Sequence, residues 1–130
     1  MIGRLLRRRG GLGPWGERRA ASYLRRRGFR VVGRNVRTRI GEADLVCVAP
    51  DRRTMVLVEV KTRDARGVAG DRRPESQLTG AKRAKLRRLV DSLARSPAWR
   101  DRPWRIDVLA VERRERGRPE IRHLERAVTG

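Results

Sequence analysis

The segment TMVLVEVKT, residues 54–62, has the clearest strand pattern in the chain and constrains the fold more than any other segment. Alternate side chains of a strand point to opposite faces of its sheet. The valines at its even positions therefore share one face, and the other face carries Met55 and Leu57, followed by Glu59 and Lys61. Apolar residues on both faces predict a buried strand, and its polar end places a carboxylate beside an ammonium group.

A second apolar run, ADLVCVA at 43–49, precedes this strand and is expected to be its neighbour. The two runs are separated by a short loop with a Pro-Asp pair, which is typical of turns. In a hairpin the start of one strand lies beside the end of the other. Asp44 and Glu59 are therefore predicted to be near neighbours at one edge of the sheet, with Lys61 beside them.

Three further strands are expected, and the short turns between the early ones favour an antiparallel meander. These strands are FRVVGRNVRT at 29–38 with an interruption at Gly33, PWRIDVLAV at 103–111, and a short last strand, EIRHLERAV, at 120–128. The segment 63–76 is rich in Gly, Arg and Asp and is expected to be a loop.

The first helix is expected within GPWGERRAASYLRRRGF, residues 13–29, where Pro14 suits the opening turn and Gly28 suits the end. Glu17 shares a helix face with the apolar residues. Those residues are Ala20, Ala21 and Leu24. A carboxylate on an apolar face is unusual, and the alternative explanation is a first-turn glutamate favoured by the helix dipole.

A second helix is expected from Leu78 to Arg95, because Pro97 blocks its continuation. Its apolar stripe has the helical period and places Lys82 among leucines. A lysine in that position can reach a phosphate, or it can extend along the surface with its ammonium group in water.

The chain carries 35 basic and 15 acidic residues, for a formal net charge of +20. Such an excess attracts polyanions and favours nucleic acid, DNA more than RNA, as the partner. Only three of the basic residues are lysines. A GC-rich coding sequence is an equally good explanation of the arginine excess, although it does not cancel the net charge. The predicted nucleic-acid-binding residues are Arg34, Arg37, Arg39, Arg63 and Lys82. For the first three, a solvated basic strand is an equally good explanation.

Length and composition exclude several classes. A chain of 130 residues is expected to form one domain, at 13–130, after a flexible basic arm at 1–12. The single cysteine, Cys47, excludes an internal disulfide and a Cys-based zinc site. No apolar run approaches the roughly 18 residues of a membrane span, and the start MIGRLLRRRGGLG is basic but lacks the apolar h-region of a secretory signal. We expect a soluble cytoplasmic protein without a membrane partner, and a homodimer is one state that it can form.

Two neighbouring carboxylates raise each other's pKa unless a cation lies between them. Mg²⁺ prefers oxygen ligands and is commonly held by one or two carboxylates together with substrate phosphate. A lysine beside it can orient water and stabilise charge on a phosphate. Asp44, Glu59 and Lys61 therefore predict metal-assisted phosphodiester hydrolysis. The alternative is a cross-strand salt bridge, which is common and contributes little to stability.

Four blocks of the chain resemble the YraN-like family of small uncharacterised bacterial proteins. They are GERRAASYLRRRGFRVVGRNVRTRIGEADLV, VLVEVKTR, WRIDVLAV and IRHLERAV, in this order. That family resembles Holliday-junction resolvases and other nucleases of the PD-(D/E)xK type. The resemblance implies an α/β fold with a restriction-endonuclease-like core, in which helices flank a central mixed β-sheet.

The resemblance also implies roles for individual residues. Asp44 and Glu59 would be metal ligands, the Val60 carbonyl a further ligand, and Lys61 the catalytic lysine. Glu17 matches the helix glutamate that completes such sites, and the implied cofactor is Mg²⁺ or Mn²⁺. Ala43 stands where the motif usually has proline.

The expected function is that of a metal-dependent DNA endonuclease, and branched or damaged DNA is implied as substrate by analogy alone. Two alternatives stay open: a non-catalytic nucleic-acid-binding module on the same fold, and an arginine-rich structural protein of the ribosome. Elsewhere in the chain, Asp107 is expected to hold a core arginine and His123 to be structural. The tryptophans are expected to anchor the core.

Overall fold

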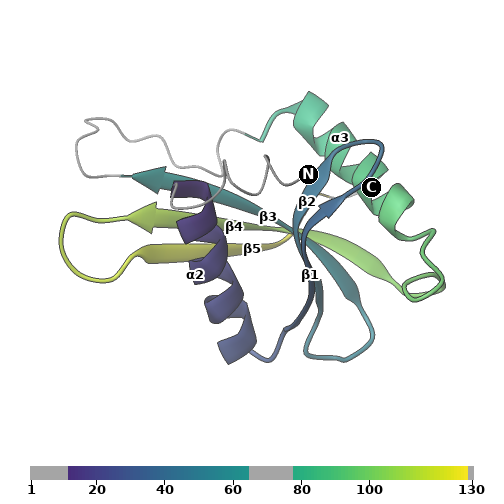
Figure 1. The fold of residues 1–130 in the computed structure, drawn as a ribbon, viewed down its shortest axis with the longest axis horizontal. Helices are drawn as coiled ribbons and strands as arrows, with labels where there is room; N and C mark the ends of the chain where they lie inside the picture. Colours follow the sequence, from purple (N-terminus) through teal and green to yellow (C-terminus); the bar gives the residue numbers. More distant parts are fainter. Residues whose placement is uncertain (1–11, 65–77, 129–130) are drawn as a thin grey trace.

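The computed structural model describes residues 12–64 and 78–128, which form a five-stranded mixed sheet with two helices (Figure 1). The elements are α2 (Leu12–Arg26), β1 (Arg30–Arg37), β2 (Glu42–Val48), β3 (Met55–Asp64), α3 (Gly80–Leu93), β4 (Trp104–Arg113) and β5 (Glu120–Val128). Of the predicted basic arm at 1–12, only Leu12 is described, and it begins α2. The predicted loop at 63–76 lies outside the described residues from 65 onward.

The strands follow one another across the sheet in the order β1-β2-β3-β4-β5, with β3 in the centre. β2 pairs antiparallel with both of its neighbours, β1 and β3, which confirms the predicted meander. β3 and β4 are parallel over their whole length, from Met55↔Trp104 to Asp64↔Arg113. Parallel neighbours need a crossover connection, and α3 lies within this one. The prediction of an α/β protein with helices flanking a mixed sheet is therefore confirmed, while the restriction-endonuclease-like assignment stays a prediction.

The alternation of β3 divides the core into two layers. Val56 and Val58 pack in a cluster with Ala20 and Leu24 of α2. Met55 and Leu57 pack in a second cluster on the other face, with leucines of α3. Those leucines are Leu86, Leu89 and Leu93. The two helices therefore cover opposite faces of the sheet (Figure 1), and the apolar half of β3 is buried between them.

Several boundaries differ from the sequence prediction by a few residues. α2 ends at Arg26, because Gly28 with φ +88° adopts the left-handed conformation just beyond the helix. α3 begins at Gly80 after Thr79, whose hydroxyl accepts a hydrogen bond from the Lys82 amide at 3.2 Å. β3 continues to Asp64, inside the predicted loop, because β4 pairs with it to that point. The predicted interruption at Gly33 is confirmed by a register shift between Val31 and Gly33.

The last strand, β5, spans the nine residues Glu120–Val128, which confirms the strand predicted for this segment. It pairs antiparallel with β4 along most of its length. The three tryptophans pack against the two core clusters as predicted: Trp15 against the α2 side, and Trp99 and Trp104 against the α3 side. Neither helix in the described ranges is both long and apolar enough to cross a membrane.

Asp107 in β4 is fully buried and forms a polar cluster with a neighbouring arginine and histidine. Arg105 donates from Nε and Nη2 to its two carboxylate oxygens, each at 3.1 Å. His123 Nε2 lies 2.8 Å from Oδ2, and the Arg126 amide donates to Oδ1 at 3.0 Å. The predicted structural roles of Asp107 and His123 are confirmed. Burial raises the pKa of Asp107, but the hydrogen bonds from His123, Arg126 and Arg105 outweigh it, so the pKa is lowered.

α2 lies close to β3 at Gly16, which is buried. A Cβ atom at this position would overlap Oγ1 of Thr62 and lie 2.8 Å from its Cγ2. The absence of a side chain therefore lets α2 lie directly on the polar half of β3. This close approach sets the position of the neighbouring Glu17.

Gly16→Ala is expected to destabilise the protein by about 1–3 kcal/mol, because the added methyl group forces α2 away from Thr62. Urea unfolding measures this change. Gly13→Ala is the matched control in the same helix, since nothing lies within 4 Å of its Cβ position. The double variant Gly16→Ala/Thr62→Ala should regain part of the loss. Equal stability of the Gly16 and Gly13 variants would contradict the close contact.

Asp107→Asn is expected to cost about 3–5 kcal/mol at pH 7, because it removes the charge that compensates Arg105. Since the folded pKa of Asp107 is lowered, its contribution is complete above the unfolded pKa of about 3.9 and is lost as pH falls through the folded pKa. Wild type should therefore lose more stability than the variant between neutral and strongly acidic pH. Urea unfolding at both pH values tests this, with the exposed Asp91→Asn as control.

Candidate functional site

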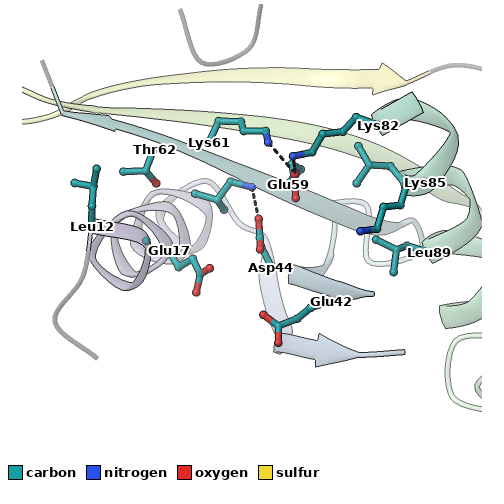
Figure 2. A pocket seen from close by; sticks show the side chains of 13 residues that line it. Leu12, Glu17, Glu42, Asp44, Glu59, Lys61, Thr62, Lys82, Lys85 and Leu89 are labelled. Atoms are coloured by element: carbon teal, nitrogen blue, oxygen red, sulfur yellow. Dashed lines mark hydrogen bonds and ion pairs between the residues drawn. The ribbon is translucent and has the colours of Figure 1, made fainter. Parts of the chain in front are cut away.

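A pocket of about 460 Å³ opens where the polar half of β3 emerges between α2, β2 and α3 (Figure 2). Its charged lining residues are Glu17, Glu42, Asp44, Glu59, Lys61, Lys82 and Lys85. With every group ionised, four carboxylates and three ammonium groups give the pocket a formal charge of −1. This is the opposite sign to the net charge of +20 on the whole chain. The pocket is thus a local exception in a strongly basic protein.

The register of the β2–β3 hairpin brings Asp44 and Glu59 together, as predicted. The paired residues of β2 and β3 end at Leu45↔Val58, so Asp44 and Glu59 lie one position beyond the last pair. The strands separate here, and the Asp44 side chain replaces the missing ladder bond. Its Oδ2 accepts a hydrogen bond from the Val60 amide at 2.8 Å (Figure 2). This bond fixes the Asp44 carboxylate against the backbone of β3.

Glu59 is held by two lysines from different elements. Its Oε2 atom lies 3.3 Å from Lys61 Nζ, on the same strand, and 3.2 Å from Lys82 Nζ, on α3. The Glu59 side chain is only 12% exposed. Burial raises the pKa of Glu59. The hydrogen bonding with Asp44 and the positive charges of the two lysines outweigh burial, so the pKa of Glu59 lies below its ordinary value.

The two lysines also influence each other. Burial lowers the pKa of Lys61, and hydrogen bonding with Lys82 lowers it further, against the opposing effect of Glu59. The interaction with Lys61 is the main cause that raises the pKa of Lys82. Lys61 therefore loses its proton more readily than an ordinary lysine, whereas Lys82 retains its own. The pocket therefore contains one lysine with a lowered pKa, Lys61, and one with a raised pKa, Lys82.

Glu17 and Glu42 line the same pocket from two sides. Glu17 is nearly buried, as its place on the apolar face of α2 predicted, and it lies on the Asp44 side of the pocket (Figure 2). Glu42 precedes Asp44 by two residues on β2, so strand alternation gives both side chains the same face. The acidic side of the pocket is therefore built from α2 and β2, and the lysines face it from β3 and α3.

The donor set fits a hard divalent cation. Asp44 and Glu59 supply carboxylate oxygens from neighbouring strands, and a cation between two close carboxylates relieves their repulsion. Within residues 12–64 and 78–128, no three His, Cys, Asp or Glu side chains form a group able to hold a metal ion. Mg²⁺ does not need such a cage, because one or two carboxylates with phosphate oxygens and water suffice. The predicted Val60 carbonyl would be a further oxygen ligand.

The structure does not bring every predicted residue to the pocket. The arginines predicted to bind nucleic acid lie outside its lining. Arg34 and Arg37 are exposed on β1, and Arg39 is exposed in the turn that follows. Arg63 lies further along β3, and its Nη1 is 3.8 Å from Glu112 Oε2. Of the predicted nucleic-acid-binding residues, only Lys82 lines the pocket.

Two lining residues, Glu42 and Lys85, were missed from the sequence. Both had a detectable signal. Glu42 shares the alternation of Asp44, and Lys85 follows Lys82 by three residues, which places the two lysines on neighbouring positions of one helix face. Their sequence context is less apolar than that of Glu59, so neither attracted attention as a misplaced charge.

Comparison with known proteins identifies a family. The model of the uncharacterised protein family UPF0102 matches residues 16–111. A UPF0102 protein of Roseiflexus castenholzii is 44% identical over 107 residues, which cover 80% of this chain and 81% of that protein. A UPF0102 protein of Mycobacterium avium is 42% identical over 117 residues, covering 88% and 87%. These similarities confirm the YraN-like resemblance, whereas the likeness to resolvases and nucleases stays a prediction.

Because Asp44 accepts a hydrogen bond from the Val60 amide, its replacement by alanine and by asparagine should change the stability of the protein to different extents. Asp44→Ala leaves that amide without its acceptor and is expected to cost about 1–3 kcal/mol. Asp44→Asn keeps an acceptor oxygen and should cost clearly less. Thermal and urea unfolding of both variants measure the difference. If the two variants are equally stable, the carboxylate does not anchor the end of β2 to β3.

Proposed function

Because the chain belongs to the uncharacterised protein family UPF0102, whose name assigns no activity, we propose its function from the site. The site supports a metal-dependent endonuclease that hydrolyses phosphodiester bonds of DNA. The observation that carries this proposal is the meeting of Asp44 and Glu59 from neighbouring strands, with Lys61 beside them in one pocket. The nuclease-like fold implied by the sequence resemblance belongs to the same proposal.

The charge of the pocket supports a divalent cation together with a phosphodiester. The formal charge of −1 from the lining side chains would become +1 with a divalent cation, and one phosphodiester anion would bring it to zero. Asp44 and Glu59 would hold Mg²⁺ or Mn²⁺, and the Val60 carbonyl would be a further ligand. When bound, the cation would stabilise negative charge on the phosphate and lower the pKa of a water molecule.

The residues of the chain have separate tasks in this scheme. Asp44 is fixed by its bond to Val60, so its carboxylate is preorganised rather than mobile. Lys61, whose pKa is lowered, orients the attacking water and donates a hydrogen bond to an oxygen of the reacting phosphate. Glu17 closes the acidic side of the pocket from α2 and supports the Asp44 carboxylate.

DNA is the proposed substrate because the protein outside the pocket is strongly basic. The exposed arginines of β1 and of the turn before β2 can contact backbone phosphates in a salt-dependent way. Phosphate contacts position a protein on nucleic acid but do not read its sequence. We therefore propose recognition by DNA shape, with branched or damaged DNA as the first substrates to test.

A second candidate function is a non-catalytic nucleic-acid-binding module. The observation that favours it is the complete pairing of Glu59, which already carries two ammonium partners. Such a network can act as structural ion pairs without any cation. In that case the protein would bind DNA through its arginines and would not cut it.

A cleavage assay separates the two functions. The purified chain is incubated with linear, nicked and four-way DNA in Mg²⁺ or Mn²⁺. Wild type is expected to cut at least one of these substrates, and Asp44→Asn and Lys61→Ala should each lower the rate by about 10²–10³-fold. The exposed Glu115→Gln is the control and should cut like wild type.

Binding must be measured beside cleavage, because the variants also change charge. Asp44→Asn should still bind DNA, since it removes negative charge. Binding without cleavage by wild type in either metal would support the non-catalytic module. Equal cleavage by wild type, Asp44→Asn and Lys61→Ala would reject the proposed site.

A further inference from the structure

All three lysines of the chain lie in one place. The chain has 35 basic residues, and only Lys61, Lys82 and Lys85 are lysines. Each of them lines the pocket, which is formed by 13 of the 130 residues, whereas no arginine in the described ranges lines it. A composition bias toward arginine would not spare lysine in a single pocket. The positions of the lysines therefore reflect a requirement of the site.

The ammonium group suits this pocket better than a guanidinium group for a physical reason. Lysine ends in a compact charge, whereas arginine ends in a wide planar fork. Lys61 and Lys82 both approach the same oxygen of Glu59, at 3.3 and 3.2 Å. The compact ammonium group suits two side chains that approach one oxygen from different elements. Arginine supplies charge elsewhere on the chain, where its greater width is accommodated.

Lys85 reaches the pocket across the turn that precedes β2. A Cβ atom at Gly41 would lie 3.1 Å from Lys85 Cε, so the lysine stem passes directly over this glycine. The turn is closed by Thr38, whose amide donates to the Gly41 carbonyl at 2.8 Å. Figure 2 shows Lys85 extending from α3 toward β2, on the side of Glu59 opposite to Lys61. The turn and α3 together direct this ammonium group.

We propose that Lys82 and Lys85 form a phosphate-binding arm on α3 that contacts the DNA phosphodiester entering the pocket. Lys82 Nζ lies 3.2 Å from Glu59 Oε2, beside Lys61. When Glu59 binds a divalent cation, Lys82 exchanges this carboxylate for a phosphate oxygen, and Lys85 contacts the same phosphate group. Lysine is an established phosphate ligand as a point charge. This inference rests on the proposed function for its ligand, a phosphodiester, but does not require that the ligand is cut.

The first test measures DNA affinity with a fluorescent duplex that carries phosphorothioate linkages, in CaCl₂, with the duplex checked for integrity. Lys82→Gln and Lys85→Gln should each weaken binding by about tenfold. Arg88→Gln is the matched control, because it removes the same charge from an exposed position of the same helix. It should weaken binding by less than about twofold, since it removes only one distant charge.

Two further variants separate contact in the pocket from net charge. Gly41→Val keeps every charge but displaces the Lys85 stem, and it should weaken binding as Lys85→Gln does. Lys82→Arg also keeps the charge, and it should bind DNA more weakly than wild type because the planar guanidinium group is wider than the ammonium group. If all the glutamine variants, Arg88→Gln included, lose the same affinity, net charge explains the effect and the inference is wrong.

The second test measures Mn²⁺ binding by calorimetry without DNA. Lys82→Gln should bind Mn²⁺ at least about fivefold more tightly, because it removes the ammonium group that competes at Glu59. Lys85→Gln should change this affinity less. Unchanged Mn²⁺ affinity in Lys82→Gln would overturn the proposal that Lys82 exchanges Glu59 for a phosphate oxygen.

The two proposals fail on different results. If wild type binds DNA through both lysines but never cuts it, the proposed endonuclease activity is refuted and the phosphate-binding arm is not. Cleavage by wild type with control-like DNA affinity in both lysine variants would refute the phosphate arm alone.

Discussion

The burial of β3 is the constraint on which the rest of the structure depends. Its first four residues, Met55 to Val58, are covered on both faces, so one helix must lie on each side of the sheet. This burial stabilises the strand by the hydrophobic effect and fixes its position in the centre. The second half of the strand then leaves the core between the N-terminal parts of α2 and α3. The pocket exists because the apolar half of one strand ends where its polar half begins.

The charges in this pocket form one coupled set rather than separate pairs. Asp44 binds the backbone of Val60, and Glu59 interacts with Asp44 and with two lysines. The pKa directions of Lys61 and Lys82 are opposite because burial is the main cause that lowers the first, whereas the interaction with Lys61 is the main cause that raises the second. A cluster of this kind responds as a whole to any added charge. A cation or a phosphate that enters the pocket would therefore redistribute several contacts at once.

Much of the acidic part of the site was predictable from strand geometry. Alternation along β3 placed Glu59 and Lys61 on one face, and hairpin pairing placed Asp44 beside them. Both arguments depend on local periodicity and a short turn, which a single sequence displays directly. The contribution of α3 was less accessible. Lys82 stood out among leucines, but Lys85 reaches the pocket only because Gly41 leaves room for its stem, and that contact joins residues from two distant elements.

The sequence by itself determined the elements of the fold, the basic character of the chain, and the meeting of two carboxylates with a lysine. These follow from side-chain periodicity and composition, which are local properties. The tertiary structure decided that β3 and β4 are parallel, because their partnership depends on how α3 crosses between them. It also decided that Glu59 is shared by Lys61 and Lys82, because this contact is set by the packing of α3 against the sheet. Periodicity can assign a side chain to a face, but only packing determines which other charges it meets there.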